Sequence, residues 1–210
     1  AASDVYKRQP LRSEAAHPNM LSMSYSRPTR RPLIASEAPP RPPLRHIIAA
    51  SVAVSLPLMT LALISTSVSD LLFLPPIGAA MALIVGAPNL PLAQPRNVVV
   101  GHLIGCTTGI ATLHMLGSTI IAAAVAAGVA FALMLLARAA HSPATATAMV
   151  TVLMPHGHGL ANDFRFIGFI FASSIMIVVL GILANRLRGI RYPTYLSLIH
   201  ISEPTRRTPI

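Results

Sequence analysis

Apolar residues run in long blocks through the middle of the chain, and polar residues or prolines separate one block from the next. Because a helix rises 1.5 Å per residue, about 20 residues cover a hydrocarbon layer of roughly 30 Å. Four blocks reach that length, and each predicts a membrane-spanning helix. They cover residues 46–68, 98–117, 118–137 and 164–185.

Two further apolar blocks are short and lie between prolines. One runs from Pro76 to Pro88 and the other from Pro143 to Pro155. A helix of about twelve residues reaches only ~18 Å, too little to cross the hydrocarbon layer. Proline suits the first turn of a helix, where its missing N–H leaves no bond unmade. We therefore expect two half-helices, the second of which either crosses the membrane with a polar start or re-enters.

The half-helices divide the chain into two copies of one pattern. Pro76 and Pro143 are 67 residues apart, and the same shift brings Val98 close to the start of the last block. Each copy holds a span, a half-helix and a span, so three crossings invert the second copy. Inverted repeats with paired, proline-interrupted segments are typical of secondary transporters, which bind substrate there. The expected fold is an all-α, polytopic membrane bundle with an inverted 3+3 repeat.

Composition excludes an ordinary soluble domain. Of the 210 residues, 53% are hydrophobic and 10% are charged, whereas soluble domains have about 25% charged residues. The mean hydropathy is +0.64. The net charge of +10 comes largely from basic residues that flank apolar blocks, so it indicates topology in a lipid bilayer and not nucleic-acid binding.

Basic residues predict the orientation. With the N-terminus in the cytoplasm, six crossings place Arg96, Arg138 and the basic cluster 186–191 there, and Arg165 alone disagrees. A five-span alternative would place the basic C-terminal end outside. We expect a multi-pass protein of the inner (plasma) membrane.

The ends of the chain differ from its middle. Residues 10–43 are rich in Pro, Arg and Ser and predict a disordered arm. Residues 1–9 and 196–210 resemble translated sequencing-adapter read-through and are set apart as artefacts. The transmembrane domain is expected over residues 44–195. Its lone cysteine, Cys106, can form no intramolecular disulfide. We expect it to be a small packing residue.

Polar groups gather where the second half-helix begins. Ser142 is the expected N-cap, Pro143 the first helical residue, and Thr145 adds a hydroxyl to the first turn. The free N–H groups and partial positive charge of a helix start suit a small anion. His141 could bond the anion or carry a proton, and Arg138 could attract anions.

The first half-helix offers Pro76 and Gly78, where a missing side chain would expose backbone to a ligand. The expected substrate site lies where the two half-helix starts meet. The alternatives are structural: Arg138 as a topology charge only, and His141 as a ligand to backbone.

Two histidines, His102 and His114, lie twelve residues apart in the block at 98–117. They point about 120° apart around a helix and share no face, so a proton relay competes with packing as their role. Gly101, Gly105 and Gly109 share one face and predict close helix approach. His156 and His158 are weak metal candidates, and neither a metal nor another cofactor is predicted.

Several of these blocks together resemble the HPP family of integral membrane proteins. The most specific is Pro-Leu-Ala-Gln-Pro-Arg-Asn-Val at 91–98; the others lie at 76–79, 101–102, 138–144 and 185–193. The family is named for a His-Pro-Pro motif, which His141 and Pro143 match while Ser142 departs from it. The resemblance implies a transporter, and because some members are associated with nitrite transport, nitrite is its leading substrate.

Two other functional classes remain open at this stage. A membrane enzyme using His102, His114 or His141 would need carboxylates or metal ligands, and this region has few carboxylates. A non-transporting membrane subunit would be recognised by a stable partner. We expect a non-enzymatic transporter or channel for a small anion, compatible with a homo-oligomer.

Overall fold

A computed structural model of the chain describes residues 41–68, 73–154 and 159–194. Those residues form six α-helices and one 3-10 helix, with no strand among them. The elements are α1 (Leu44–Val68), α2 (Pro75–Gly86), η2 (Pro91–Ala93), α3 (Pro95–Leu116), α4 (Ile120–Leu136), α5 (Ser142–Leu153) and α6 (Leu160–Leu187). The predicted all-α fold is confirmed, including the two short helices α2 and α5 of 12 residues each.

Three helices, α1, α3 and α6, are long and apolar enough to cross a membrane. The expected full span at 118–137 is shorter, because α4 has only 17 residues. Thr119 caps its start by accepting a hydrogen bond from the N–H of Ala122 at 3.0 Å. Its end is fixed by Arg138, which has a φ of 51° and so leaves the right-handed helical region. An ideal helix of that length covers about 26 Å.

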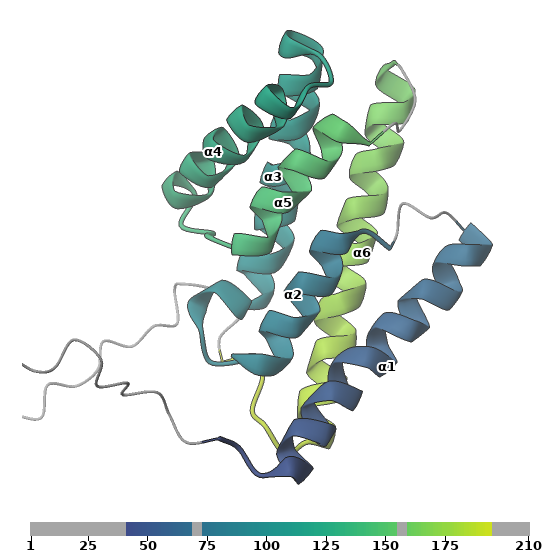
Figure 1. Cartoon of the computed structure of the whole chain (residues 1–210), viewed down its shortest axis with the longest axis vertical. Coiled ribbons are helices and arrows are strands. Elements are labelled where there is room, and N and C mark those ends of the chain that lie inside the picture. Colours follow the sequence, from purple (N-terminus) through teal and green to yellow (C-terminus); the bar gives the residue numbers. More distant parts are fainter. Residues whose placement is uncertain (1–40, 69–72, 155–158, 195–210) are drawn as a thin grey trace, which may run out of the picture. The chain divides into compact units, whose positions relative to one another are not determined.

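The two half-helices start near the same level and run in opposite directions. In Figure 1, α2 descends and α5 rises from about the level of the middle of α6. The start of α1 and the end of α6 lie together at the lower end. Extensive packing joins α3 to α4, α5 and α6, α6 to α1 and α2, α1 to α2, α4 to α5, and α2 to α5.

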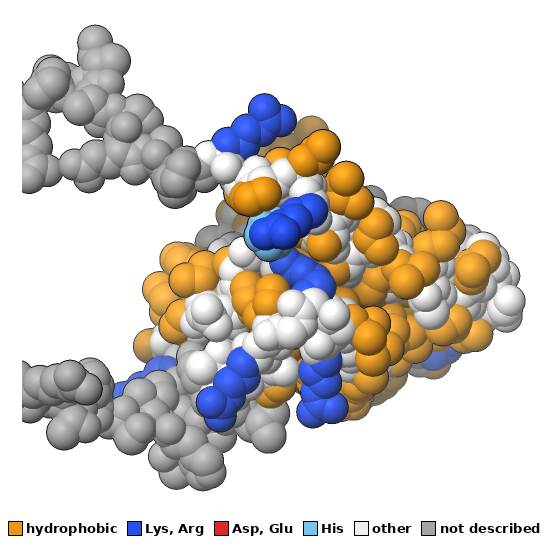
Figure 2. Space-filling model, turned by 90° about the horizontal axis from the view of Figure 1, so that it is seen from below, with side chains coloured by type: hydrophobic (Ala, Val, Ile, Leu, Met, Phe, Trp, Pro, Cys, Tyr) orange, Lys and Arg blue, Asp and Glu red, His pale blue; other side chains and the backbone are white. Residues whose placement is uncertain are grey.

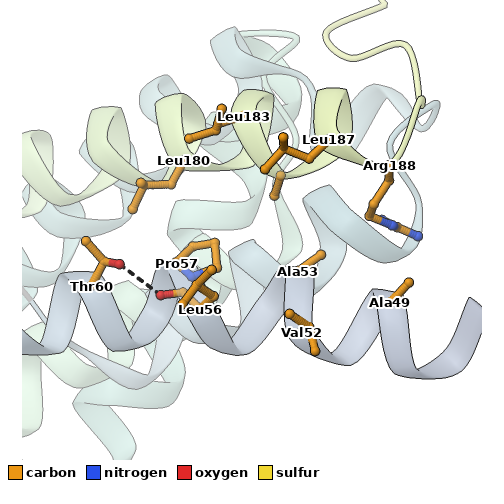
Figure 3. A pocket seen from close by; sticks show the side chains of 11 residues that line it. Ala49, Val52, Ala53, Leu56, Pro57, Thr60, Leu180, Leu183, Leu187 and Arg188 are labelled. Atoms are coloured by element: carbon orange, nitrogen blue, oxygen red, sulfur yellow. Dashed lines mark hydrogen bonds between the residues drawn. The ribbon is translucent and has the colours of Figure 1, made fainter.

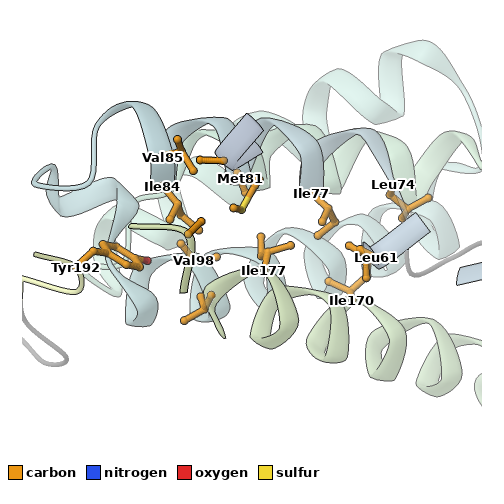
Figure 4. Packing of buried hydrophobic residues seen from close by; sticks show 14 of the residues in the cluster. Leu61, Leu74, Ile77, Met81, Ile84, Val85, Val98, Ile170, Ile177 and Tyr192 are labelled. Carbon is orange, nitrogen blue, oxygen red and sulfur yellow. The ribbon is translucent and has the colours of Figure 1, made fainter. Parts of the chain in front are cut away.

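One apolar core surrounds α2. Ile77, Met81 and Ile84 of α2 are fully buried against Ile170 and Ile177 of α6 (Figure 4). Gly181 of α6 leaves room for Ile84, because a Cβ built there would lie 2.6 Å from the Ile84 Cγ2. Close packing of these side chains against α6 stabilises this half-helix.

A second core of small residues joins α3, α4 and α5. A Cβ built on Gly109 would lie 2.6 Å from Thr151 Cβ, and one on Gly101 would lie 2.7 Å from His141 Cβ. A Cβ on Gly105 would clash with the carbonyl oxygen of Ala144. The close approach predicted from the glycine spacing is therefore confirmed, and the helix that approaches is α5.

Basic side chains lie at the lower end, where α1 begins and α6 ends. Figure 2, which views the structure from below, shows Arg side chains among hydrophobic ones, with no acidic side chain in view. Arg45 lies in the first turn of α1, and Arg186, Arg188 and Arg191 follow the apolar part of α6. The two ends of the helical unit therefore share one basic face.

Substitution of Gly105 tests the contact between α3 and α5. We expect Gly105→Ala to lower the free energy of unfolding by about 1–3 kcal/mol, because the new methyl meets the Ala144 carbonyl. The matched control is Gly128→Ala in α4, where nothing lies within 4 Å and helix propensity favours alanine by about 1 kcal/mol. Thermal unfolding in detergent measures both. Equal stability of the two variants would contradict the close contact.

Candidate functional site

The start of α5 is one residue earlier than expected. The N-cap is His141, with φ −146° and ψ 102°, and the helix begins at the exposed Ser142. The expectation that Ser142 caps the helix was therefore wrong. The first turn already closes through the N–H of Ala144, which donates to the His141 carbonyl at 3.0 Å. Pro143 is then the second helical residue, a position where its missing N–H is still harmless.

The His141 side chain turns away from its own helix. It makes no capping bond to α5. Its Nδ1 lies 2.7 Å from the backbone carbonyl oxygen of Leu92, just before α3. His141 is fully buried, so this bond fixes the ring against the segment between α2 and α3.

His102 of α3 completes a histidine pair. Its ring lies 5.0 Å from the His141 ring, centroid to centroid, at an interplanar angle of 66°. Its Nδ1 lies 2.8 Å from the Thr147 hydroxyl of α5. His102 and His141 are both 0% exposed. Of the candidate residues predicted from sequence, these two are the ones that the structure brings together.

The remaining nitrogen of each ring has no partner. Within the described ranges, three buried side-chain atoms lack a hydrogen bond: Asn97 Oδ1, His102 Nε2 and His141 Nε2. Buried polar groups are almost always bonded, and each exception calls for an explanation such as a bound water or ligand. The pair is therefore the position best suited to bind something small and polar.

The bond to Leu92 fixes the tautomer of His141. A carbonyl oxygen only accepts, so Nδ1 must carry the hydrogen. In the neutral ring, Nε2 then holds a lone pair and can only accept. His102 is not fixed in this way, because the Thr147 hydroxyl can donate or accept.

The segment 88–94 positions the Leu92 carbonyl. The amide of the fully buried Gln94 donates to the carbonyls of Pro88 at 2.8 Å and Leu90 at 3.0 Å. The Tyr192 hydroxyl donates to the Ala93 carbonyl at 2.7 Å, and burial raises the pKa of that hydroxyl. Sequence reasoning did not assign Gln94 or Tyr192 to the site, although both lie in blocks that carry the family resemblance.

Arg138 takes part in the contacts near the site through its backbone carbonyl, not through its side chain. The guanidinium of Arg96 donates to the carbonyls of Arg138 at 2.8 Å and Ala137 at 3.0 Å. A cation at the carboxyl end of a helix is favourable, so Arg96 stabilises the end of α4. The Arg138 side chain itself is exposed.

The other predicted residues lie apart from the pair or serve the backbone. Gly78 faces α1, where a Cβ would lie 3.9 Å from Leu58 Cδ1. Pro76 is buried in α2. Thr145 is half-buried and donates to the Ser142 carbonyl at 2.7 Å.

His114 lies at the opposite end of α3 from the pair. Its Nε2 is 2.8 Å from a carboxylate oxygen of Asp163 at the start of α6. The two histidines of α3 therefore serve different contacts, as their angular separation predicted. His156 and His158 fall outside the described residues.

A large groove between α1 and α6 is apolar and separate from the pair. It has a volume of about 370 Å³, and Figure 3 shows Pro57 and Ala53 of α1 opposite Leu180 and Leu187 of α6. Hydrocarbon side chains line it almost throughout, with Thr60 bonded to its own helix at Leu56. Its lining suits lipid chains rather than a small polar ligand.

Comparison with known proteins supports a membrane role. A family model described as "HPP, transmembrane region" matches residues 39–193. Transmembrane protein DDB_G0273707/DDB_G0273361 of Dictyostelium discoideum is 32% identical over 121 residues, which are 56% of this chain and 39% of that protein. Transmembrane protein DDB_G0269096 of the same organism is 29% identical over 121 residues, 56% of this chain and 42% of that protein. The chain thus spans about two fifths of these relatives, and no solved structure matches it.

The His141 tautomer can be measured directly. We expect the ¹⁵N spectrum of selectively labelled protein in bilayers at neutral pH to show a protonated Nδ1 and an unprotonated Nε2 for His141. The exposed His46 is the internal control. An Nε2-protonated signal for His141 would contradict the bond to Leu92.

Proposed function

The chain belongs to the HPP family of transmembrane proteins, and from that premise we propose that it transports a small anion, most specifically nitrite. The observation that carries the proposal is the pair of fully buried histidines whose Nε2 atoms have no partner within the described part of the chain. His141 is the N-cap of the half-helix α5, and at a helix start backbone N–H groups and the helix dipole favour negative charge.

The site is proposed to lie near the middle of the bilayer. In its support, α5 begins about level with the middle of α6, and α2 begins at a similar level and runs the other way (Figure 1). Polar groups at that depth are tolerated where they face protein or a water-filled path. We assign Ser142 and Pro143 to the helix start that faces the anion, with Thr145 ordering its first turn. Pro76 begins the opposed helix.

An inverted repeat is proposed to provide alternating access. The packing supports it: exchanging α1, α2 and α3 with α4, α5 and α6 converts each extensively packed helix pair into another that also packs. The groove between α1 and α6 likewise has a counterpart between α3 and α4, with a volume of about 500 Å³. In transporters of this kind, one repeat moves against the other around a fixed central site.

Orientation follows from charge. We propose that the lower end in Figure 1 faces the cytoplasm of a cell whose inner (plasma) membrane holds the protein. Its support is the basic face formed by Arg45 and the arginines after α6 (Figure 2), since cytoplasmic ends are enriched in Lys and Arg. An enzymatic role is the weaker alternative: the nearest helix carboxylate, Asp163, bonds His114 at the other end of α3.

Uptake of nitrite into proteoliposomes tests the function. We expect saturable uptake by the full chain and a loss of about 10- to 100-fold in His102→Asn or His141→Asn, because a hydrogen bond to a charged group contributes about 1.5–3 kcal/mol. Asparagine keeps a donor near the Nδ1 position, so the bonds to Thr147 and Leu92 can persist. His46→Asn, at an exposed residue, is the matched control. Unchanged uptake in both site variants would refute the proposed site.

The contribution of Arg138 can be separated from its backbone role. Glycine adopts a φ of 51° without strain, so Arg138→Gly removes the charge while the turn after α4 is kept. If this exposed charge attracts anions, nitrite KM should rise at low ionic strength and return to the wild-type value in high salt, where exposed charges are screened. A KM independent of salt in both proteins would leave Arg138 with a topological role alone.

A further inference from the structure

We propose that His102 and His141 bind one proton together with each anion, so that the protein moves the anion in electrically neutral form. This inference rests on the proposed transport function and deepens it, because it specifies the coupling ion. It starts from the two Nε2 atoms, which are buried on neighbouring rings and have no partner among the residues that the structure describes.

The tautomer of His141 requires a proton for anion binding. With Nδ1–H committed to the Leu92 carbonyl, the neutral ring presents a lone pair at Nε2. A lone pair repels an anion. When Nε2 gains a proton, the ring becomes a cation whose N–H points from a fixed position and can donate to the anion.

No described charged side chain is directed at the pair, so a proton on the pair has no other counter-charge than the anion. From α3, the guanidinium of Arg96 is directed to the end of α4; from the α4–α5 connection, the Arg138 side chain is exposed. From α5, the group that contacts the pair is the neutral Thr147. The packed segments α2 and 88–94 contain no ionisable side chain. Described carboxylates are thus absent from the neighbourhood, with Asp163 at the far end of α3.

A charge buried without a partner is costly, and this makes the two ligands depend on each other. A protonated histidine pair would be an uncompensated cation in a region of low dielectric. An anion at the unprotonated pair would be equally uncompensated. When the proton and the anion are bound together, their charges cancel. Each therefore raises the affinity of the site for the other by the same factor.

The cycle balances in atoms and charge. On one side of the membrane, a proton forms the Nε2–H bond and the anion accepts a hydrogen bond from it. On the other side, the anion leaves and the Nε2–H bond breaks, which returns the proton to water. No electron is transferred, and one positive and one negative charge cross together.

Proteoliposomes with a controlled potential and an internal pH dye test the inference. After subtraction of the passive flux in protein-free vesicles, we expect one proton to enter with each nitrite. We also expect the initial rate to stay unchanged when a potassium diffusion potential is imposed. A rate that follows the potential, without proton entry, would overturn the coupling while leaving nitrite transport intact.

Equilibrium binding of nitrite in detergent distinguishes the two proposals. One linked proton requires the Kd to fall about tenfold for each unit by which pH is lowered, as long as the free pair is unprotonated. We expect that slope in the wild type and in His46→Asn, and its loss in His141→Asn. If binding shows this slope but vesicles show no saturable flux, transport fails and the joint binding of proton and anion stands. If flux occurs and binding is independent of pH, the coupling fails and transport stands. A chain that shows neither flux nor linked binding overturns both.

Discussion

The approach of α5 to the glycine face of α3 is the contact on which the site depends. Gly101, Gly105 and Gly109 each leave space that a single methyl would fill, and α5 places backbone and Cβ atoms there. The helices are therefore close enough for the His102 ring to reach Thr147 and to lie 5.0 Å from His141. Side chains at these three positions would separate the helices and the two rings with them. Because dispersion and close packing, rather than hydrophobic burial, hold helices together in lipid, this contact also stabilises the fold.

Irregular backbone inside the membrane domain is possible because its polar groups are satisfied by specific side chains. The segment 88–94 gives its carbonyls to Gln94, His141 and Tyr192. At the end of α2, the carbonyl of Ile84 accepts a hydrogen bond from Asn185, and the carbonyl of Val85 accepts one from Arg188. At the end of α4, two carbonyls accept hydrogen bonds from Arg96. Where water is excluded, each unbonded group would cost several kcal/mol. The residues that permit two half-helices are therefore found outside them.

The sequence predicts where the helices lie along the chain better than it predicts which neighbours each helix face contacts. Prolines, block lengths and glycine spacing identify α2, α5 and the close contact of α3, because these depend on local conformation and size. One error came from a property that the local sequence does not define. Ser142 was expected to cap α5, but His141 takes the extended conformation because its ring is bonded to a residue 49 positions away. That Gly78 faces α1 also depends on distant contacts, because the core residues of α2 pack on α6. The pairing of His102 with His141 likewise needs the distance between two helices, which no local pattern contains.

The serine at position 142 is consistent with a site that binds a proton and an anion together. The resemblance to the HPP family implies a proline at this place, and a proline has no N–H to offer. Serine is the first helical residue here, so it restores one backbone donor to a turn in which Pro143 already lacks one. The backbone N–H of Ser142 is neutral. It can donate a hydrogen bond to an anion without adding a second positive charge beside the protonated histidine pair. Under the proposed function, Ser142 would therefore add a donor for the anion at the helix start and leave the charge balance to the proton and the anion.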